Sequence, residues 1–274
     1  MRETKTLDQA GQRPVDIDRL RRRITPGRVT VAVAAVILYW WVFADTEISA
    51  RDFIDGFPAM GKLLALMFPP DWAAMTRFLG PAIETFQIGV TATLLGAVLA
   101  IPTAYLGARN LSPHPIVCSV TRSILAVFRG VSEIVWALIF VVAVGLGPFA
   151  GVLALALFTI GMIGKLLSEA VEAVDPGPLE VLRAAGAGEW RVFLYGAWPQ
   201  ILPTFISYSL YYWDSNTRQA TVVGFVGAGG LGYTLFTSIN AYRFEQATAA
   251  LILMVLIIVV IDRFCLFLRR RLDR

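Results

Sequence analysis

Three polar residues interrupt a mostly apolar segment, 202–226, in the C-terminal third of the chain: Asp214, Asn216 and Arg218. Asp214 and Arg218 are four residues apart, so on a helix they share one face and can form an ion pair. Charged side chains inside a membrane are costly, and they usually face a protein interior or an aqueous path. In such a path the arginine could bind an anion of the phosphate type, because a guanidinium matches its oxygens. The same pair could instead hold the helix in its bundle, or belong to a gate.

A run of glycines follows these polar residues. The stretch GAGGLG at 227–232 satisfies the G-x-G-x-x-G pattern of dinucleotide-binding sites. We reject that interpretation, because no strand–helix–strand pattern surrounds the run and no acidic residue lies about 20 positions further on. Glycines here interrupt the span and let the backbone approach a neighbouring helix or a water-filled path. We therefore expect Gly227 and Gly229 to line a pathway or gate together with the three polar residues.

A second candidate site lies in the polar segment 169–200. Its sequence predicts two short helices separated by Gly186, a residue type that tolerates a positive φ at a helix end. Such a compact knob could dock into a cleft on another protein and transmit a rigid-body movement. A plain amphipathic helix in a loop is the alternative interpretation.

The spacing within this segment resembles the EAA-x3-G signature of the membrane subunits of ABC importers. Glu180, Gly186 and Pro199 match that signature and its I-x-L-P continuation. The positions that depart from it are Val181, Leu182, Gly196 and Trp198. The resemblance implies that the knob contacts an ATPase and couples its movement to the membrane helices. The residues expected to make this contact are Glu180, Arg183, Ala184, Gly186 and Ala187.

Catalytic chemistry has little support in the sequence. The chain has one histidine, His114, and two cysteines, Cys118 and Cys265, which lie far apart. This set forms neither a zinc site nor a disulfide framework, and an intramembrane enzyme would need a catalytic set within the spans. The sequence also lacks GxxxxGK[ST], so the chain does not bind ATP through a Walker motif. We expect no catalytic residue, no metal and no cofactor in this chain.

The composition predicts the elements that position these residues. Of the 274 residues, 57% are hydrophobic and 16% charged, whereas soluble domains carry roughly a quarter charged residues. The composition excludes a disordered or disulfide-rich chain and predicts an all-α polytopic membrane protein with about six transmembrane helices. The expected spans are 27–44, 82–106, 124–146, 149–168, 202–226 and 246–267.

The basic residues predict the orientation of these spans. Eighteen of the 24 Lys and Arg lie in the N-terminal tail, in the segments 107–123 and 165–200, and at the C-terminal end. The positive-inside rule then places both termini in the cytoplasm, which requires an even number of spans. We interpret the net charge of +4 as this topology signal, and we expect no nucleic-acid partner.

Four stretches resemble the membrane subunit of phosphonate-uptake ABC transporters: 80–110, 129–157, 164–187 and 198–232. The resemblance implies a type I importer-like permease in the plasma (inner) membrane of a bacterium. It further implies a homodimer, a cytoplasmic ABC ATPase dimer that holds ATP and Mg, and an extracytoplasmic phosphonate-binding protein. The substrate would be a phosphonate, or the related oxyanions phosphite and phosphate.

Three parts of the chain are expected from this pattern. Residues 1–26 form a basic cytoplasmic tail, which can lie on anionic membrane lipid. Residues 27–80 contain the first transmembrane helix and an extracytoplasmic interfacial segment. Residues 81–274 form the core transmembrane domain, with the coupling segment at 169–200.

A secondary transporter or channel for a small anion, working without an ATPase, is the alternative function. Secondary carriers often contain an inverted internal repeat, and we detect none in this sequence. Such a carrier would move its substrate when purified alone, which distinguishes it from an ATP-driven importer.

Overall fold

The computed structural model describes residues 26–45 and 50–272. Every regular element in this part of the chain is helical, so the all-α prediction is confirmed. The elements are α2 (Pro26–Asp45), α3 (Ala50–Met67), α4 (Trp72–Arg77), α5 (Leu79–Gly107), α6 (Pro115–Gly130), α7 (Glu133–Val144), α8 (Pro148–Glu172), α9 (Pro176–Ala184), α10 (Glu189–Val192), the π-helical turn η1 (Phe193–Ala197), α11 (Trp198–Gly224), α12 (Gly230–Asn240) and α13 (Phe244–Leu272).

The chain divides into two units, of which the first ends at Lys62 and the second runs from Leu63 to Arg274. The first unit contains α2, whose apolar part, Thr30–Ala44, is shorter than a full membrane span. It also contains most of α3, which falls in the segment expected to lie at the membrane interface. The predicted basic tail lies outside the described residues up to residue 25.

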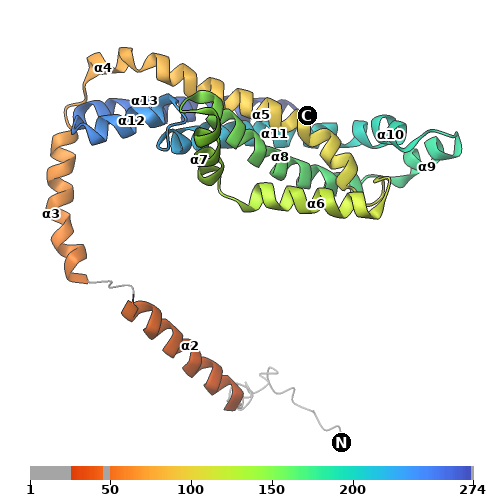
Figure 1. Cartoon of the computed structure of the whole chain (residues 1–274), viewed down its shortest axis with the longest axis horizontal. Helices are drawn as coiled ribbons and strands as arrows, with labels where there is room; N and C mark the ends of the chain where they lie inside the picture. Colours follow the sequence, from red (N-terminus) through yellow and green to blue (C-terminus); the bar gives the residue numbers. More distant parts are fainter. Residues whose placement is uncertain (1–25, 46–49, 273–274) are drawn as a thin grey trace, which may run out of the picture. The chain divides into compact units, whose positions relative to one another are not determined.

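The second unit is built around the pair α5 and α8, and α11 packs against both of them. Helices α6 and α7 lie against α8, while α12 and α13 pack on each other and on α11 (Figure 1). Small residues allow this close packing: a Cβ added to Gly96 of α5 would lie 2.5 Å from the Cβ of Thr159 of α8. Membrane helices associate through such small residues, because lipid provides no hydrophobic driving force between them.

Three helices of the described chain are long and apolar enough to cross a membrane: Leu79–Gly107, Pro148–Glu172 and Phe244–Arg271. They coincide with the second, fourth and sixth expected spans. The fifth expected span corresponds to α11, which has 27 residues but a more polar sequence. The first corresponds to the shorter apolar helix in α2.

The expected span at 124–146 is not one uninterrupted helix. This segment consists of α6 and α7, which meet at an angle of 91°. Val131 and Ser132 have extended backbone conformations, with ψ of 131° and 145°, and they interrupt the helical hydrogen bonds. Together, α6 and α7 are long and apolar enough to form one broken span. The described chain therefore contains three spans, or four if this pair is counted as one.

The segment that connects α8 to α11 forms a knob, defined here as residues 175–197. Figure 1 shows α9 and α10 at one end of the second unit, beyond the C-terminal ends of α5 and α8. Leu179, Val192 and Phe193 of the knob are fully buried against Leu167 and Val171 of α8. The knob is therefore packed onto the helical bundle rather than attached by a free loop.

Candidate functional site

The first helix of the knob ends in a defined C-terminal cap. The backbone N–H of Gly186 donates to the carbonyl of Arg183 at 2.9 Å, and that of Ala187 donates to the carbonyl of Leu182 at 3.0 Å. This pair of hydrogen bonds is a Schellman motif, which needs a left-handed residue at the position of Gly186. Gly186 has a φ of +79°, so the predicted positive φ at this break is confirmed.

Arg183 joins the two short helices of the knob. Its guanidinium donates to both carboxylate oxygens of Glu189, at 2.9 and 2.8 Å. A further N–H donates at 2.9 Å to the backbone carbonyl of Asn110, in the loop after α5. The hydrogen bonds from Arg183 lower the pKa of the Glu189 carboxyl below its ordinary value. Arg183 thus holds the knob together and ties it to a neighbouring loop.

One face of the knob is exposed. Of the residues expected to contact an ATPase, four are exposed and Ala187 is half-buried; the four are Glu180, Arg183, Ala184 and Gly186. Two large apolar side chains of the knob are also exposed: Val181 of α9 is 69% exposed and Tyr195 of η1 is 71% exposed. The knob therefore presents both polar and apolar side chains to its surroundings.

The knob continues directly into α11. The last residues of α10 lead through the π-helical turn η1 into α11, so the backbone remains helical from Glu189 to Gly224. Single-turn π-helical segments occur often at functional sites.

The predicted ion pair forms on α11, roughly 24 to 30 Å from Trp198 along the helix. The guanidinium of Arg218 donates to both oxygens of Asp214, at 3.0 and 2.6 Å. The Asp214 side chain is 11% exposed and that of Arg218 is 46% exposed. The carboxylate is therefore enclosed by protein, while much of the guanidinium remains open to its surroundings.

Asn216 lies on α11 between these two residues but is 1% exposed. Its side-chain N–H groups donate to the hydroxyls of Thr93 on α5 and Thr159 on α8, both at 2.9 Å. These bonds link the three central helices. The structure therefore gives Asn216 polar partners within the bundle.

The glycine run forms the turn between α11 and α12. Gly227 and Gly229 have φ values of +96° and +79°, which the other residue types rarely adopt. The carbonyl of Gly227 accepts a hydrogen bond at 2.9 Å from the N–H of Gly147, just before α8. A Cβ on Gly229 would lie 2.5 Å from a carboxylate oxygen of Glu84, the end of a flexible side chain that can move, so it is the positive φ that favours glycine here. The knob, the ion pair and the glycine turn therefore lie at successive positions along α11, not in one cluster.

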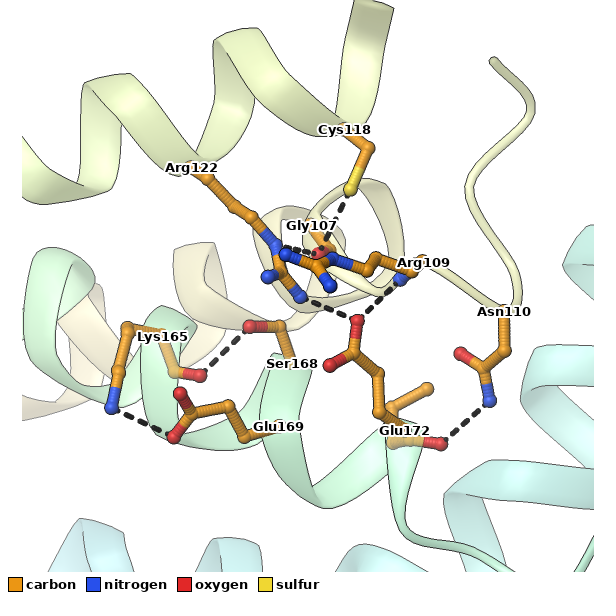
Figure 2. Close-up of polar contacts among 10 residues, drawn as sticks. Gly107, Arg109, Asn110, Cys118, Arg122, Lys165, Ser168, Glu169 and Glu172 are labelled. Atoms are coloured by element: carbon orange, nitrogen blue, oxygen red, sulfur yellow. Dashed lines mark hydrogen bonds and ion pairs between the residues drawn. The ribbon is translucent and has the colours of Figure 1, made fainter. Parts of the chain in front are cut away.

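A polar cluster that the sequence analysis did not single out lies where α5, α6 and α8 meet (Figure 2). The Arg122 guanidinium donates to the carbonyl of Gly107 at 2.8 Å and forms an ion pair with Glu172. Glu172 also accepts a hydrogen bond at 2.7 Å from the backbone N–H of Arg109. Arg122 and Glu172 are 50 residues apart, so no local pattern indicates their contact.

The part of the chain that the structure describes contains no candidate metal site. No group of three or more His, Cys, Asp or Glu side chains there could hold a metal ion. Both cysteines are buried and free.

The sequence matches the family of binding-protein-dependent transport system inner membrane components over residues 92–274. The chain belongs to this family, and its apolar helices make it a multi-pass membrane protein. It is 36% identical to the phosphite transport system permease protein PtxC of Stutzerimonas stutzeri over 244 residues, which cover 89% of this chain and 88% of the relative.

A longer relative matches with higher identity. The phosphate-import permease protein PhnE of Mycolicibacterium smegmatis is 42% identical over 245 residues, which cover 89% of this chain but 43% of that protein. This chain therefore spans less than half the length of that relative.

Two solved structures share the fold. The MetNI methionine ABC transporter in an inward-facing conformation matches with a TM-score of 0.63 and 20% identity, over 74% of this chain and 100% of that chain. A bacterial ABC transporter that imports alginate matches with a TM-score of 0.60 and 16% identity, over 93% of this chain and 100% of that chain. These likenesses establish a type I ABC importer permease fold.

Proposed function

We propose that this chain is the permease subunit of an ATP-driven importer that carries a phosphonate, or the related oxyanions phosphite and phosphate, into the cytoplasm. The observation that carries this proposal is the knob, an exposed two-helix element that Arg183 clamps and that continues into α11. The names of the relatives support the substrate class, since PtxC is a phosphite permease and PhnE a phosphate-import permease.

The knob is the coupling element in this proposal. Its exposed residues, which include Glu180, Ala184 and Gly186, dock in a cleft on a separate ATPase subunit. ATP and Mg bind to that subunit, and hydrolysis takes place there, so this chain supplies no catalytic residue. Closure of the ATPase dimer displaces the knob, and α11 carries the displacement into the membrane.

In this proposal, the ion pair on α11 lines the pathway along which the oxyanion crosses the membrane. Asp214 orients the Arg218 guanidinium, and the exposed part of that guanidinium offers N–H donors to a passing oxyanion. Asn216 anchors this part of α11 to α5 and α8. Gly227 and Gly229 give the end of α11 a turn that can act as a gate.

The assembly in this proposal contains two copies of the chain, two copies of the ATPase and an extracytoplasmic binding protein. The knob and both termini face the cytoplasm of the bacterium, in agreement with the distribution of basic residues. The binding protein delivers the oxyanion to the cavity between the two copies.

Reconstituted uptake tests this function. The chain is purified with its ATPase and binding protein, placed in liposomes, and given labelled phosphonate, phosphite or phosphate with and without ATP. Uptake that needs both ATP and the binding protein supports the importer. Uptake by this chain alone, indifferent to ATP, would show the alternative function, a channel or secondary transporter.

A further inference from the structure

A cavity of about 580 Å³ lies between α6 and the loop that follows α5. Its polar lining consists of two arginines and three serines: Arg109, Arg122, Ser112, Ser119 and Ser123. No acidic side chain of residues 26–45 or 50–272 lines it. In Figure 2, the side chains of Arg109 and Arg122 extend toward Gly107 from opposite sides.

The charges around this cavity do not balance. Glu172 pairs with Arg122 and accepts a hydrogen bond from the backbone of Arg109, but the Arg109 guanidinium has no side-chain or backbone partner among the described residues. Glu172 therefore pairs with only one of the two guanidinium groups, that of Arg122. Arg109 is exposed and the Arg122 side chain is 31% exposed, so water screens their mutual repulsion, and both guanidinium groups are accessible to an anion from solution.

Unused hydrogen-bond donors accompany this excess of positive charge. None of the five side-chain N–H groups of Arg109 bonds to another described residue, and Arg122 uses only part of its fork on Gly107 and Glu172. The Ser119 hydroxyl likewise makes no hydrogen bond within the described chain, whereas that of Ser123 is already bonded to the Ser119 carbonyl at 2.9 Å.

We propose that this cavity binds an oxyanion of the phosphate type through Arg109, Arg122 and Ser119. Guanidinium groups bind such oxygens through paired, charge-assisted hydrogen bonds. The phosphate group can belong to the headgroup of an anionic lipid or to free inorganic phosphate, since both present the same oxygens. The site is distinct from the Arg218 position on α11, because it is built from α6 and the loop after α5.

The surrounding charges favour the same ligand. A second cavity of about 210 Å³ shares Arg122 and is also lined by Arg129, Lys165 and Glu169. Lys165 and Glu169 pair at 2.7 Å, while Arg129 has no ion pair within the described residues. The surroundings of the two cavities therefore contain four cationic side chains and two carboxylates. The cations are Arg109, Arg122, Arg129 and Lys165, and the carboxylates are Glu169 and Glu172.

The site adjoins the knob through the loop after α5. Asn110 follows Arg109 directly, and its carbonyl accepts the hydrogen bond from Arg183. Its side-chain amide donates at 2.9 Å to the carbonyl of Val171. An anion held by Arg109 therefore lies one residue from the point where the knob is tied to the loop.

Binding to the full-length chain in lipid nanodiscs tests the proposal. In one arm, the nanodiscs contain only phosphatidylcholine, and inorganic phosphate is titrated calorimetrically at constant ionic strength, with chloride as the replaced anion. In the other, phosphatidylglycerol is mixed in, and native mass spectrometry counts the molecules that stay bound. The test variant is Arg109→Gln, since the Arg109 side chain loses no hydrogen bond or ion pair to the described residues.

The matched control is Arg243→Gln. Arg243 is exposed, makes no side-chain ion pair in the described chain, and precedes α13 at the other end of the second unit. This variant removes the same charge from a distant surface. Thermal unfolding of both variants checks that the fold is unchanged.

We expect Arg109→Gln to weaken binding about tenfold, the usual effect of losing a hydrogen bond to a charged group, and Arg243→Gln to leave it unchanged. Loss in the phosphate arm identifies a free ion as the ligand, and loss in the phosphatidylglycerol arm identifies a lipid headgroup. The proposal is overturned if the wild-type chain binds neither ligand, if Arg109→Gln binds as wild type does, or if both variants lose binding equally.

Discussion

Arg183 connects three segments that are separate in the sequence: α9, α10 and the loop after α5. Its contacts with Glu189 form a bidentate pair, and its contact with Asn110 anchors that pair to the bundle. Both side chains of the pair are partly exposed, at 38% and 41%, so water screens the interaction. We therefore assign it a contribution below about 1 kcal/mol to overall stability, and a larger role in fixing the shape of the knob.

The lowered pKa of Glu189 predicts how this clamp responds to pH. A carboxyl whose pKa is depressed in the folded state contributes stability above its ordinary value of 4.5, and this contribution is lost as the pH falls through the depressed value. We expect amide hydrogen exchange in 183–189 to be slower in the wild type than in Glu189→Gln near neutral pH. The difference should shrink below about pH 4.5. A difference that stays constant over this range would show that the pair does not order the knob.

The role of Arg218 can be separated from that of its ion pair. Arg218→Gln alone leaves the Asp214 carboxylate enclosed without a counter-charge, which destabilises the folded chain. This loss occurs whether the arginine binds substrate or only stabilises the fold, so the single variant does not separate the two roles. The double variant Asp214→Asn/Arg218→Gln removes both charges. If Arg218 binds the oxyanion, we expect this folded double variant to transport at least about tenfold more slowly than the wild type.

The measurement is initial uptake of labelled oxyanion in liposomes, with the thermal unfolding temperature as the check on folding. Uptake restored to the wild-type rate in the double variant would identify the pair as structural. The conservative variant Arg218→Lys keeps the charge but loses the bidentate geometry, so it should transport at an intermediate rate.

At the scale of elements, the fold depends on the close contact of α5 with α8. Gly96→Leu is expected to destabilise the chain by about 1–3 kcal/mol or more, because its Cβ alone would lie 2.5 Å from Thr159. Gly80→Leu is the matched control, since it lies on the same helix with nothing within 4 Å of an added Cβ. Thermal unfolding in detergent measures both. Equal losses would contradict the packing described here.

The helices followed from the sequence wherever the local pattern decides the structure. Long apolar runs predicted α5, α8 and α13, and Gly186 predicted the break in the knob, because both signals depend on neighbouring residues. The bend between α6 and α7 escaped prediction because the mean hydropathy of 124–146 is high enough for one span. Arg129, Gly130, Ser132 and Glu133 interrupt the apolar run at the bend, but hydropathy carries no information about the extended backbone at Val131 and Ser132. The partners of Asn216 and Arg122 could not be predicted from local patterns, because they lie on helices that are far away in the sequence.

At the scale of the whole molecule, α11 connects the proposed sites. The knob leads into its first turn, the ion pair lies in its second half, and the glycine turn follows its end. The family and the class of substrate were also predicted from the sequence, through the knob motif and the four resembling stretches. The contacts with an ATPase and the passage of the oxyanion along Arg218 remain proposals that transport measurements can test.

The measurement that tests the central claim most directly compares two proline variants of the knob in reconstituted liposomes. Gly186→Pro removes the N–H that caps α9 and cannot adopt the φ of +79°. Gly188→Pro is the control two residues away, because Gly188 has a φ of −67°, which proline favours, and nothing within 4 Å of its Cβ position.

ATP hydrolysis and labelled oxyanion uptake are recorded in the same liposomes. We predict that Gly186→Pro inserts normally but loses ligand-stimulated hydrolysis and uptake together, or hydrolyses ATP without uptake, whereas Gly188→Pro behaves nearly as wild type. Normal ligand-stimulated hydrolysis and uptake in Gly186→Pro would contradict the claim that the knob couples this chain to an ATPase.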